Sequence, residues 1–180
     1  MAPHDLVAPQ PVESEVIIET RGLSRVYPGV TALDNVNYRV YRNKVNVLIG
    51  ENGAGKSTMM KMLAGVETPS SGQIILDGEA VSLHSTHQAE KLGISIIFQE
   101  LNLFPNMNVM DNIFMANEFF QKGRINEKYQ YALAKSLLER LELDVDPYAP
   151  LGELGIGRQQ LVEIARALSK DTRVLIMDEP

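Results

Sequence analysis

Residues 50–58 read GENGAGKST and fit the phosphate-binding loop pattern G-x-x-x-x-G-K-[ST], whose fixed positions here are Gly50, Gly55, Lys56 and Ser57. Glycines let the backbone curl around an anion, so that successive N–H groups point at phosphate oxygens. The positive end of a following helix and the Lys56 ammonium would add charge, and the Ser57 hydroxyl can ligate Mg²⁺. The stretch therefore predicts a nucleoside triphosphate site, and the alternative is a merely glycine-rich turn.

The flanking residues supply the context that this pattern needs. Residues 45–49 (VNVLI) predict a buried strand, and residues 59–64 (MMKMLA) predict a helix. Further strands are expected at 16–19, 35–41, 73–76, 94–98 and 173–177, and further helices at 86–92, 109–117, 126–141 and 158–169. Asp77-Gly78 is a hairpin pattern. We expect an α/β fold, a P-loop NTPase core with a largely parallel sheet, an antiparallel β portion near the N-terminus and an inserted α-helical subdomain at about 100–157.

Length and composition limit the class of protein. The chain has 180 residues, of which 44% are hydrophobic and 22% charged, as in an ordinary globular domain. Residues 1–14 carry three prolines and predict a flexible tail ahead of a folded domain at 15–180. No apolar run is as long as a membrane-spanning helix and no secretory leader is visible, so a cytoplasmic protein is expected. The absence of cysteine excludes disulfides, and a net charge of −6 without a basic stripe argues against broad nucleic-acid binding.

Two stretches downstream of the loop also carry chemistry. Asp178 and Glu179 follow the apolar run 173–177 (RVLIM). A carboxylate at the carboxyl end of a buried strand lies where open α/β sheets bind ligands, although an isolated Asp-Glu pair is usually solvated surface. We interpret Asp178 as a metal-side residue and Glu179 as a candidate general base. Residues 154–160 (LGIGRQQ) open the last helix, either as a second anion site or as a glycine-rich helix start and nothing more.

Taken together, four motifs resemble those of an ABC-transporter ATPase. They are GENGAGKST, the glutamine in IIFQE (96–100), LGIGRQQLVEIARAL (154–168) and VLIMDEP (174–180). Their order is that of the family, and the resemblance covers about residues 15–180. Residues 27–36 (YPGVTALDNV), 99–103 (QELNL) and 159–165 (QQLVEIA) are similar to the N-terminal ATPase domain of bacterial sugar importers of the ribose, xylose, arabinose and galactose type. Subunits of that subgroup carry two tandem ATPase domains.

The resemblance implies ATP and Mg²⁺ as ligands and assigns roles to single residues. Tyr27 would stack on the adenine, unless it is simply a core aromatic, and Lys56 would contact the β- and γ-phosphates. The phosphates would be wrapped by Gly50, Glu51, Asn52, Gly53, Ala54, Gly55, Lys56, Ser57 and Thr58. Magnesium would be held by Ser57, Gln99 and Asp178, and catalysis would rest on Glu179, Gln99 and Lys56. Gly155 and Gly157 would face the γ-phosphate on a second ATPase domain, so that two domains enclose two nucleotides.

The resemblance also implies partners and an activity. Residues 101–117, in the helical insertion, would meet a membrane permease on the inner face of the cell membrane, and a periplasmic sugar-binding protein would take part only indirectly. The implied function is ATP hydrolysis that powers monosaccharide import. Two alternatives stay open: a non-hydrolysing ATP-binding module, and a soluble ABC ATPase that acts on nucleic acid or the ribosome. The acidic charge balance argues against the second.

The chain departs from the family pattern in two places. The family signature begins Leu-Ser-Gly-Gly-Gln, whereas residues 154–158 read LGIGR. Without the serine hydroxyl, anion binding at this helix should be weakened rather than abolished, and Arg158 either adds charge near the phosphate or faces solvent. The family also continues beyond the acidic strand to a switch histidine. We therefore expect a truncated domain, incomplete at the C-terminus, that binds nucleotide weakly and turns over little by itself.

Overall fold

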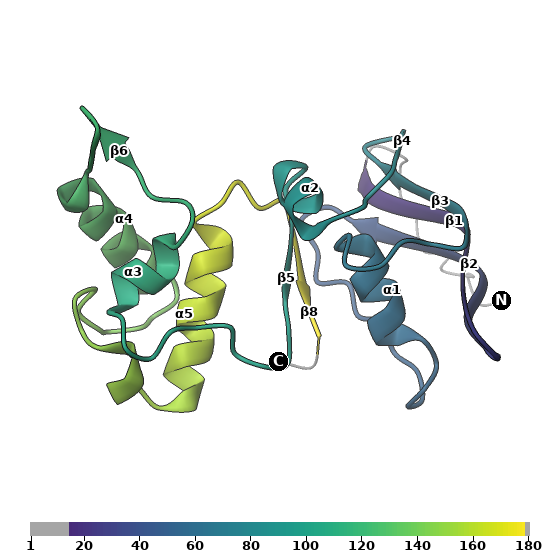
Figure 1. The fold of residues 1–180 in the computed structure, drawn as a ribbon. Helices are drawn as coiled ribbons and strands as arrows, with labels where there is room; N and C mark the ends of the chain where they lie inside the picture. Colours follow the sequence, from purple (N-terminus) through teal and green to yellow (C-terminus); the bar gives the residue numbers. More distant parts are fainter. Residues whose placement is uncertain (1–14, 179–180) are drawn as a thin grey trace, which may run out of the picture. The chain divides into compact units, whose positions relative to one another are not determined.

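The computed structural model describes residues 15–178, which form two compact units, one ending at His84 and one beginning at Ser85 (Figure 1). The predicted tail at 1–14 and the candidate base Glu179 lie outside the described residues. None of the described helices is long and apolar enough to cross a lipid bilayer.

The N-terminal unit is built on an antiparallel sheet of four strands in the order β2-β1-β3-β4. The strands are β1 (Val16–Tyr27), β2 (Val30–Tyr41), β3 (Ser71–Leu76) and β4 (Glu79–Val81). Asp77 and Gly78 form the β3–β4 turn with φ values of 54° and 84°, as the hairpin pattern predicts. Helix α1 (Lys56–Leu63) buries Met59, Met62 and Leu63. The predicted antiparallel portion near the N-terminus is thereby confirmed.

The strand predicted at residues 45–49 is wrong. This segment has no strand partner among the described residues, and Val45, Val47 and Ile49 are 92%, 68% and 88% exposed. The side chain of Asn46 folds back on the end of β2 instead. Its Oδ1 accepts from the Tyr41 amide at 3.0 Å, and its Nδ2 donates to the Tyr41 carbonyl at 3.0 Å. Local side-chain hydrogen bonds from Asn46 thus compete with strand pairing in a segment that is otherwise apolar.

Parallel pairing occurs in the C-terminal unit. Strands β5 (Ile94–Ile97) and β8 (Val174–Met177) run parallel, with Ile94 opposite Val174 and Ile97 opposite Met177. Helix α2 (Thr86–Lys91) leads into β5 and begins at Ser85, whose hydroxyl accepts from the Gln88 amide at 3.2 Å. The chain therefore combines an antiparallel sheet and a parallel pair, as predicted, but parallel pairing among the described residues is confined to these two strands.

Three helices of the C-terminal unit share one apolar core. They are α3 (Val109–Phe114), α4 (Glu127–Arg140) and α5 (Ile156–Leu168), and Figure 1 shows them gathered on one side of β5 and β8. A short hairpin of β6 (Phe120–Gln121) and β7 (Arg124–Ile125) joins α3 to α4, and the 3-10 turn η2 (Leu151–Glu153) precedes α5. The core consists of Val109, Met110, Ile113, Phe114, Ala134, Leu137, Leu138, Leu143, Leu151, Val162 and Ala165. The helical patterning of the sequence predicts all three helices.

Helix α3 ends earlier than the expected residue 117. Met115 has an extended backbone, and Ala116 has φ 60°, which stops the helix after Phe114. The Asn108 side chain accepts from the Asp111 amide at 2.7 Å and begins the same helix. The segment that the sequence assigns to a permease contact is therefore a short capped helix with irregular chain on both sides.

Candidate functional site

The phosphate loop turns through two left-handed glycines before α1. Gly53 and Gly55 have φ values of 85° and 84°, a region that side-chain-bearing residues rarely adopt. Gly55 is also packed closely, since a Cβ there would lie 2.4 Å from the Ala32 carbonyl oxygen and 2.7 Å from Leu33 Cδ2. A Cβ at Gly53 would meet nothing within 4 Å. Glycine at position 55 thus lets the start of α1 approach β2, whereas glycine at position 53 serves the turn alone.

The Lys56 side chain lies over the loop that precedes it. Its ammonium donates to the Gly50 carbonyl at 2.8 Å and to the Glu51 carbonyl at 2.9 Å. Helix α1 begins at this lysine, its N-cap residue Gly55 supplies no side-chain acceptor, and its first turn carries no acidic residue. Amide N–H groups at a helix start and an adjacent ammonium are a favourable environment for an anion. Residues 50–58 therefore bring together a helix start without acidic residues and a nearby ammonium, an arrangement that favours an anion.

Tyr27 lies at the end of β1 and is held by two side chains that the sequence did not indicate. Its hydroxyl donates to the Glu67 carboxylate, and the Arg25 guanidinium lies over its ring, 4.8 Å from the centroid. Arg25 also donates to the Thr68 carbonyl at 2.6 Å. One face of the ring is thus occupied by a cation, and a stacked base would have to use the other face.

Two predicted site residues lie at one edge of the parallel strand pair. Gln99 comes two residues after β5, and Asp178 follows β8 directly. The Asp178 amide donates to the Ile97 carbonyl at 3.1 Å, which extends the pairing past the end of β8. The carboxyl ends of parallel strands emerge at the same edge, where α/β sheets bind ligands. The side-chain amide oxygen of Gln99 and the carboxylate of Asp178 are ligands of the kind that Mg²⁺ accepts. Ser57, which belongs to the N-terminal unit, carries a hydroxyl oxygen of the same kind.

Helix α5 presents an exposed N-terminus. Gly155 is its N-cap with an extended backbone (φ −62°, ψ 155°), and the amides of Arg158 and Gln159 donate to its carbonyl at 2.9 and 3.1 Å. A Cβ added to Gly155 or Gly157 would meet nothing within 4 Å. Packing within the described residues therefore does not require glycine at either position. The helix end is open on its outer side, as a surface that binds an external anion would be.

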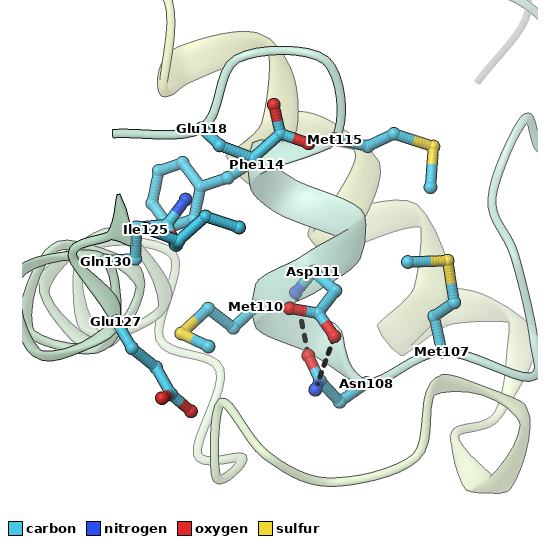
Figure 2. A pocket seen from close by; sticks show the side chains of 10 residues that line it. All are labelled: Met107, Asn108, Met110, Asp111, Phe114, Met115, Glu118, Ile125, Glu127 and Gln130. Atoms are coloured by element: carbon cyan, nitrogen blue, oxygen red, sulfur yellow. Dashed lines mark hydrogen bonds between the residues drawn. The ribbon is translucent and has the colours of Figure 1, made fainter. Parts of the chain in front are cut away.

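A groove of about 400 Å³ lies between α3 and the start of α4 (Figure 2). Three methionines and three carboxylates share its lining, and Figure 2 shows them on both sides of α3: Met107, Met110, Met115, Asp111, Glu118 and Glu127. Gln130, which is only 4% exposed, also lines the groove. Methionine side chains adapt to the shape of a partner. The groove includes part of residues 101–117, the segment predicted to meet a permease.

Residues 33–180 match the family described as ABC transporter. The chain belongs to this family. It is 48% identical, over 93% of its length, to an L-arabinose transport ATP-binding protein of Geobacillus stearothermophilus, and 49% identical, over 91%, to a ribose import ATP-binding protein of Streptomyces coelicolor. The matched regions are 33% and 32% of those relatives. The chain thus spans about a third of the length of the curated relatives it matches.

Solved structures of ABC cassettes share the fold of this ABC family member. The ADP conformation of MJ1267, an ATP-binding cassette of an ABC transporter, aligns with a TM-score of 0.76 and 26% identity over 89% of this chain and 67% of that one. The cbiO1 protein of Clostridium perfringens aligns with a TM-score of 0.77 and 29% identity over 92% of this chain and 66% of that one. The predicted fold class and the predicted family are confirmed.

One contact in this ABC cassette was not indicated by the sequence. Two side chains of α5, Glu163 and Arg166, bind the backbone of Asn102, which lies three residues after Gln99. The Asn102 amide donates to Glu163 Oε1 at 3.3 Å, and Arg166 Nη1 donates to the Asn102 carbonyl at 2.8 Å. Burial raises the pKa of the Glu163 carboxyl, a shift that the bond from Asn102 and the charge of Arg166 oppose. Helical spacing does not place Glu163 in the apolar stripe of Leu161, Ile164, Ala165 and Leu168, so the sequence carried no signal for this contact.

Proposed function

We propose that this chain binds Mg-ATP at residues 50–58 and that it is part of an ATPase that powers monosaccharide import through a membrane permease. The observation that carries the proposal is the phosphate loop itself, with its left-handed Gly53 and Gly55 and with Lys56 held at 2.8 and 2.9 Å from the loop carbonyls. The sugar is suggested by relatives named for arabinose, ribose and xylose. Residues 15–180 would form the ATPase domain, with a helical subdomain at about 100–157.

The nucleotide would be held by the loop and by Tyr27. Lys56 would leave the carbonyls of Gly50 and Glu51 for the β- and γ-phosphates, because a charged phosphate oxygen is the stronger acceptor. The remaining contacts would come from Asn52, Gly53, Ala54, Gly55, Ser57 and Thr58. The adenine would stack on the face of Tyr27 opposite Arg25, which leaves the ring between a cation and a base.

Hydrolysis would be an in-line displacement at the γ-phosphorus. The oxygen of a water molecule forms the new P–O bond, the bond to the β–γ bridging oxygen breaks, and Glu179 accepts the water proton. Gln99 would orient this water, and Lys56 would stabilise the charge on the transferred phosphoryl group. Mg²⁺, bound through Ser57, Gln99 and Asp178, would supply further charge neutralisation.

A second ATPase domain would complete each site. The exposed N-terminus of α5, with Gly155 and Gly157, would bind the γ-phosphate held by the partner domain, through N–H groups and the helix dipole. The absence of a serine hydroxyl at position 155 would make this contact weaker than in relatives that carry one. The partner domain would be either a tandem domain of the same protein or a second copy.

The permease would dock on residues 101–117 and the adjoining groove. The groove is large enough for apolar side chains from a partner and offers methionine sulfur together with carboxylates. A solved relative, cbiO1, is part of an ABC transporter complex. We place the protein in the cytoplasm, peripheral on the inner face of the cell membrane, with a periplasmic sugar-binding protein as an indirect partner and no nucleic acid. The names of the relatives favour this function over a ribosomal or nucleic-acid role.

The test is steady-state phosphate release by the full-length gene product, with and without Glu179→Gln. Removing a general base lowers turnover by about 10²- to 10⁴-fold, and we expect a loss in that range. The matched control is Glu139→Gln, which alters an exposed carboxylate on α4 and should leave turnover unchanged. Robust turnover that does not respond to Glu179→Gln would contradict the proposed mechanism.

A further inference from the structure

We propose that Glu163 and Arg166 are positioning residues that fix the glutamine segment 99–102 to α5, so that Gln99 follows the movements of the signature helix. The consequence for Gln99 rests on the proposed function, but the geometry rests on hydrogen bonds within one compact unit. Glu163 Oε1 accepts from the Asn102 amide, and Arg166 donates to the Asn102 carbonyl, at 3.3 and 2.8 Å. Both backbone groups of one residue are thus bound by one helix. We call this arrangement the Asn102 clamp.

Stability alone does not account for a carboxylate in this place. Glu163 is only 7% exposed, and its Oε2 has no hydrogen-bond partner in the described part of the chain. A buried carboxylate that is only half satisfied is less favourable than an apolar side chain of similar size. Asn102 itself is exposed, so water could satisfy its peptide groups without the clamp. An unfavourable group that persists at a functional segment points to a role other than packing.

The surroundings connect the clamp to the catalytic glutamine. Glu163 lines a cavity of about 20 Å³ together with Gln99 and Gln160. This volume has room for a single water molecule. The carboxylate therefore contacts the glutamine segment at Asn102 and shares a cavity with Gln99 itself.

Helix α5 then links three features of the proposed function. Its N-terminus carries Gly155 and Gly157, its middle carries the clamp, and the clamped segment continues directly into residues 103–117. A hydrogen-bonded helix moves nearly as a rigid body, whereas an untethered loop does not follow it. Engagement of the second nucleotide at the helix start would therefore reposition Gln99 and the proposed permease surface together.

The first test is amide hydrogen exchange of residues 99–104 in the protein without nucleotide. Glu163→Leu removes the acceptor, and we expect exchange in this segment to rise about 10-fold, the factor for loss of one hydrogen bond to a charged group. Glu163→Gln keeps an acceptor oxygen, so exchange in this segment should stay within about 2-fold of that in the unaltered protein. The matched control, Glu139→Gln, alters an exposed carboxylate on α4 outside the clamp and should leave exchange in residues 99–104 unchanged. Arg166→Ala removes the hydrogen bond to the Asn102 carbonyl and should raise exchange in this segment as much as Glu163→Leu does.

The second test separates positioning from folding. Glu163→Leu should leave the thermal midpoint unchanged or raise it, while kcat of the full-length ATPase falls about 10-fold at unchanged KM. Glu163→Gln should restore kcat. The clamp would be overturned if neither hydrogen exchange nor kcat changed in Glu163→Leu and Arg166→Ala. It would also be overturned if Glu163→Leu lowered the thermal midpoint and Glu163→Gln lost as much kcat as Glu163→Leu. If the protein does not bind ATP at all, the proposed function fails, but the exchange result still decides the clamp.

Discussion

At the scale of the residue, the two left-handed glycines of the phosphate loop are needed for different reasons: both have a positive φ, and one is also closely packed. Gly53 and Gly55 have almost the same φ, but only Gly55 is packed against β2. An alanine at either position has to accept a positive φ, at a cost of about 1–2 kcal/mol. At Gly55 the added methyl group would also overlap a backbone oxygen at 2.4 Å, which cannot move as a flexible side chain could.

We therefore predict that Gly53→Ala lowers the free energy of unfolding by about 1–2 kcal/mol and that Gly55→Ala lowers it by more than about 3 kcal/mol. Urea denaturation monitored by circular dichroism measures both variants. If both variants lost the same free energy of unfolding, the close packing of position 55 against Leu33 of β2 would not be the reason for glycine there.

Some residues of the proposed site could be predicted from the sequence, and others could not. The loop at 50–58 and the Asp178 edge follow from motifs, because their chemistry depends on short runs of sequence with a fixed spacing. The hydrogen bond from Tyr27 to Glu67 and the clamp on Asn102 join residues that are far apart in the chain. Such contacts depend on where the chain folds back on itself, and a single sequence contains no direct record of this.

At the scale of the element, helix α5 lacks the side-chain cap that its position favours. Gly155 has an extended backbone and open space around it, so a serine would fit without strain. We predict that Gly155→Ser raises the free energy of unfolding by a few tenths of a kcal/mol, the usual difference between glycine and serine at an N-cap. The same hydroxyl should increase ATP turnover in the full-length protein, because it adds a donor where the partner nucleotide would bind.

Thermal unfolding and phosphate release measure the two effects separately. A rise in stability without a rise in turnover would show that the start of α5 is only a helix end and not a nucleotide contact. The matched control is Gly155→Ala, whose methyl group also has open space around it but adds no hydroxyl to cap the helix or to donate to a nucleotide.

The elements also show where pattern reading succeeds and where it fails. Helices α4 and α5 were predictable from apolar spacing, since each buries a stripe of its own residues in the shared core. Residues 45–49 form an almost continuous apolar run, as a buried strand does, yet they form no strand, and Asn46 bonds to Tyr41 instead. A helix satisfies its backbone internally, whereas a strand exists only if a neighbour pairs with it. The periodicity of a segment cannot say whether that neighbour is available.

At the scale of the whole molecule, the residues that we propose to act on ATP come from both compact units, and a second ATPase domain would add others. Tyr27 and residues 50–58 belong to the first unit, and Gln99, Asp178 and the start of α5 belong to the second. The chain covers about a third of its curated relatives, whose names describe ATP-binding proteins for sugar import. Nucleotide binding is the property on which all further roles depend, because Mg²⁺, water and the second domain would all act on the bound phosphates.

The most direct test is therefore calorimetric titration of the protein with Mg-ATP, comparing the unaltered chain with Lys56→Ala. Loss of a charge-assisted hydrogen bond of about 1.5–3 kcal/mol predicts a Kd that is about 10- to 100-fold higher. Lys61→Ala, which removes a lysine from the last turn of the same helix, should leave Kd unchanged. A Kd that is the same for Lys56→Ala as for the unaltered chain would contradict the assignment of residues 50–58 as the ATP site.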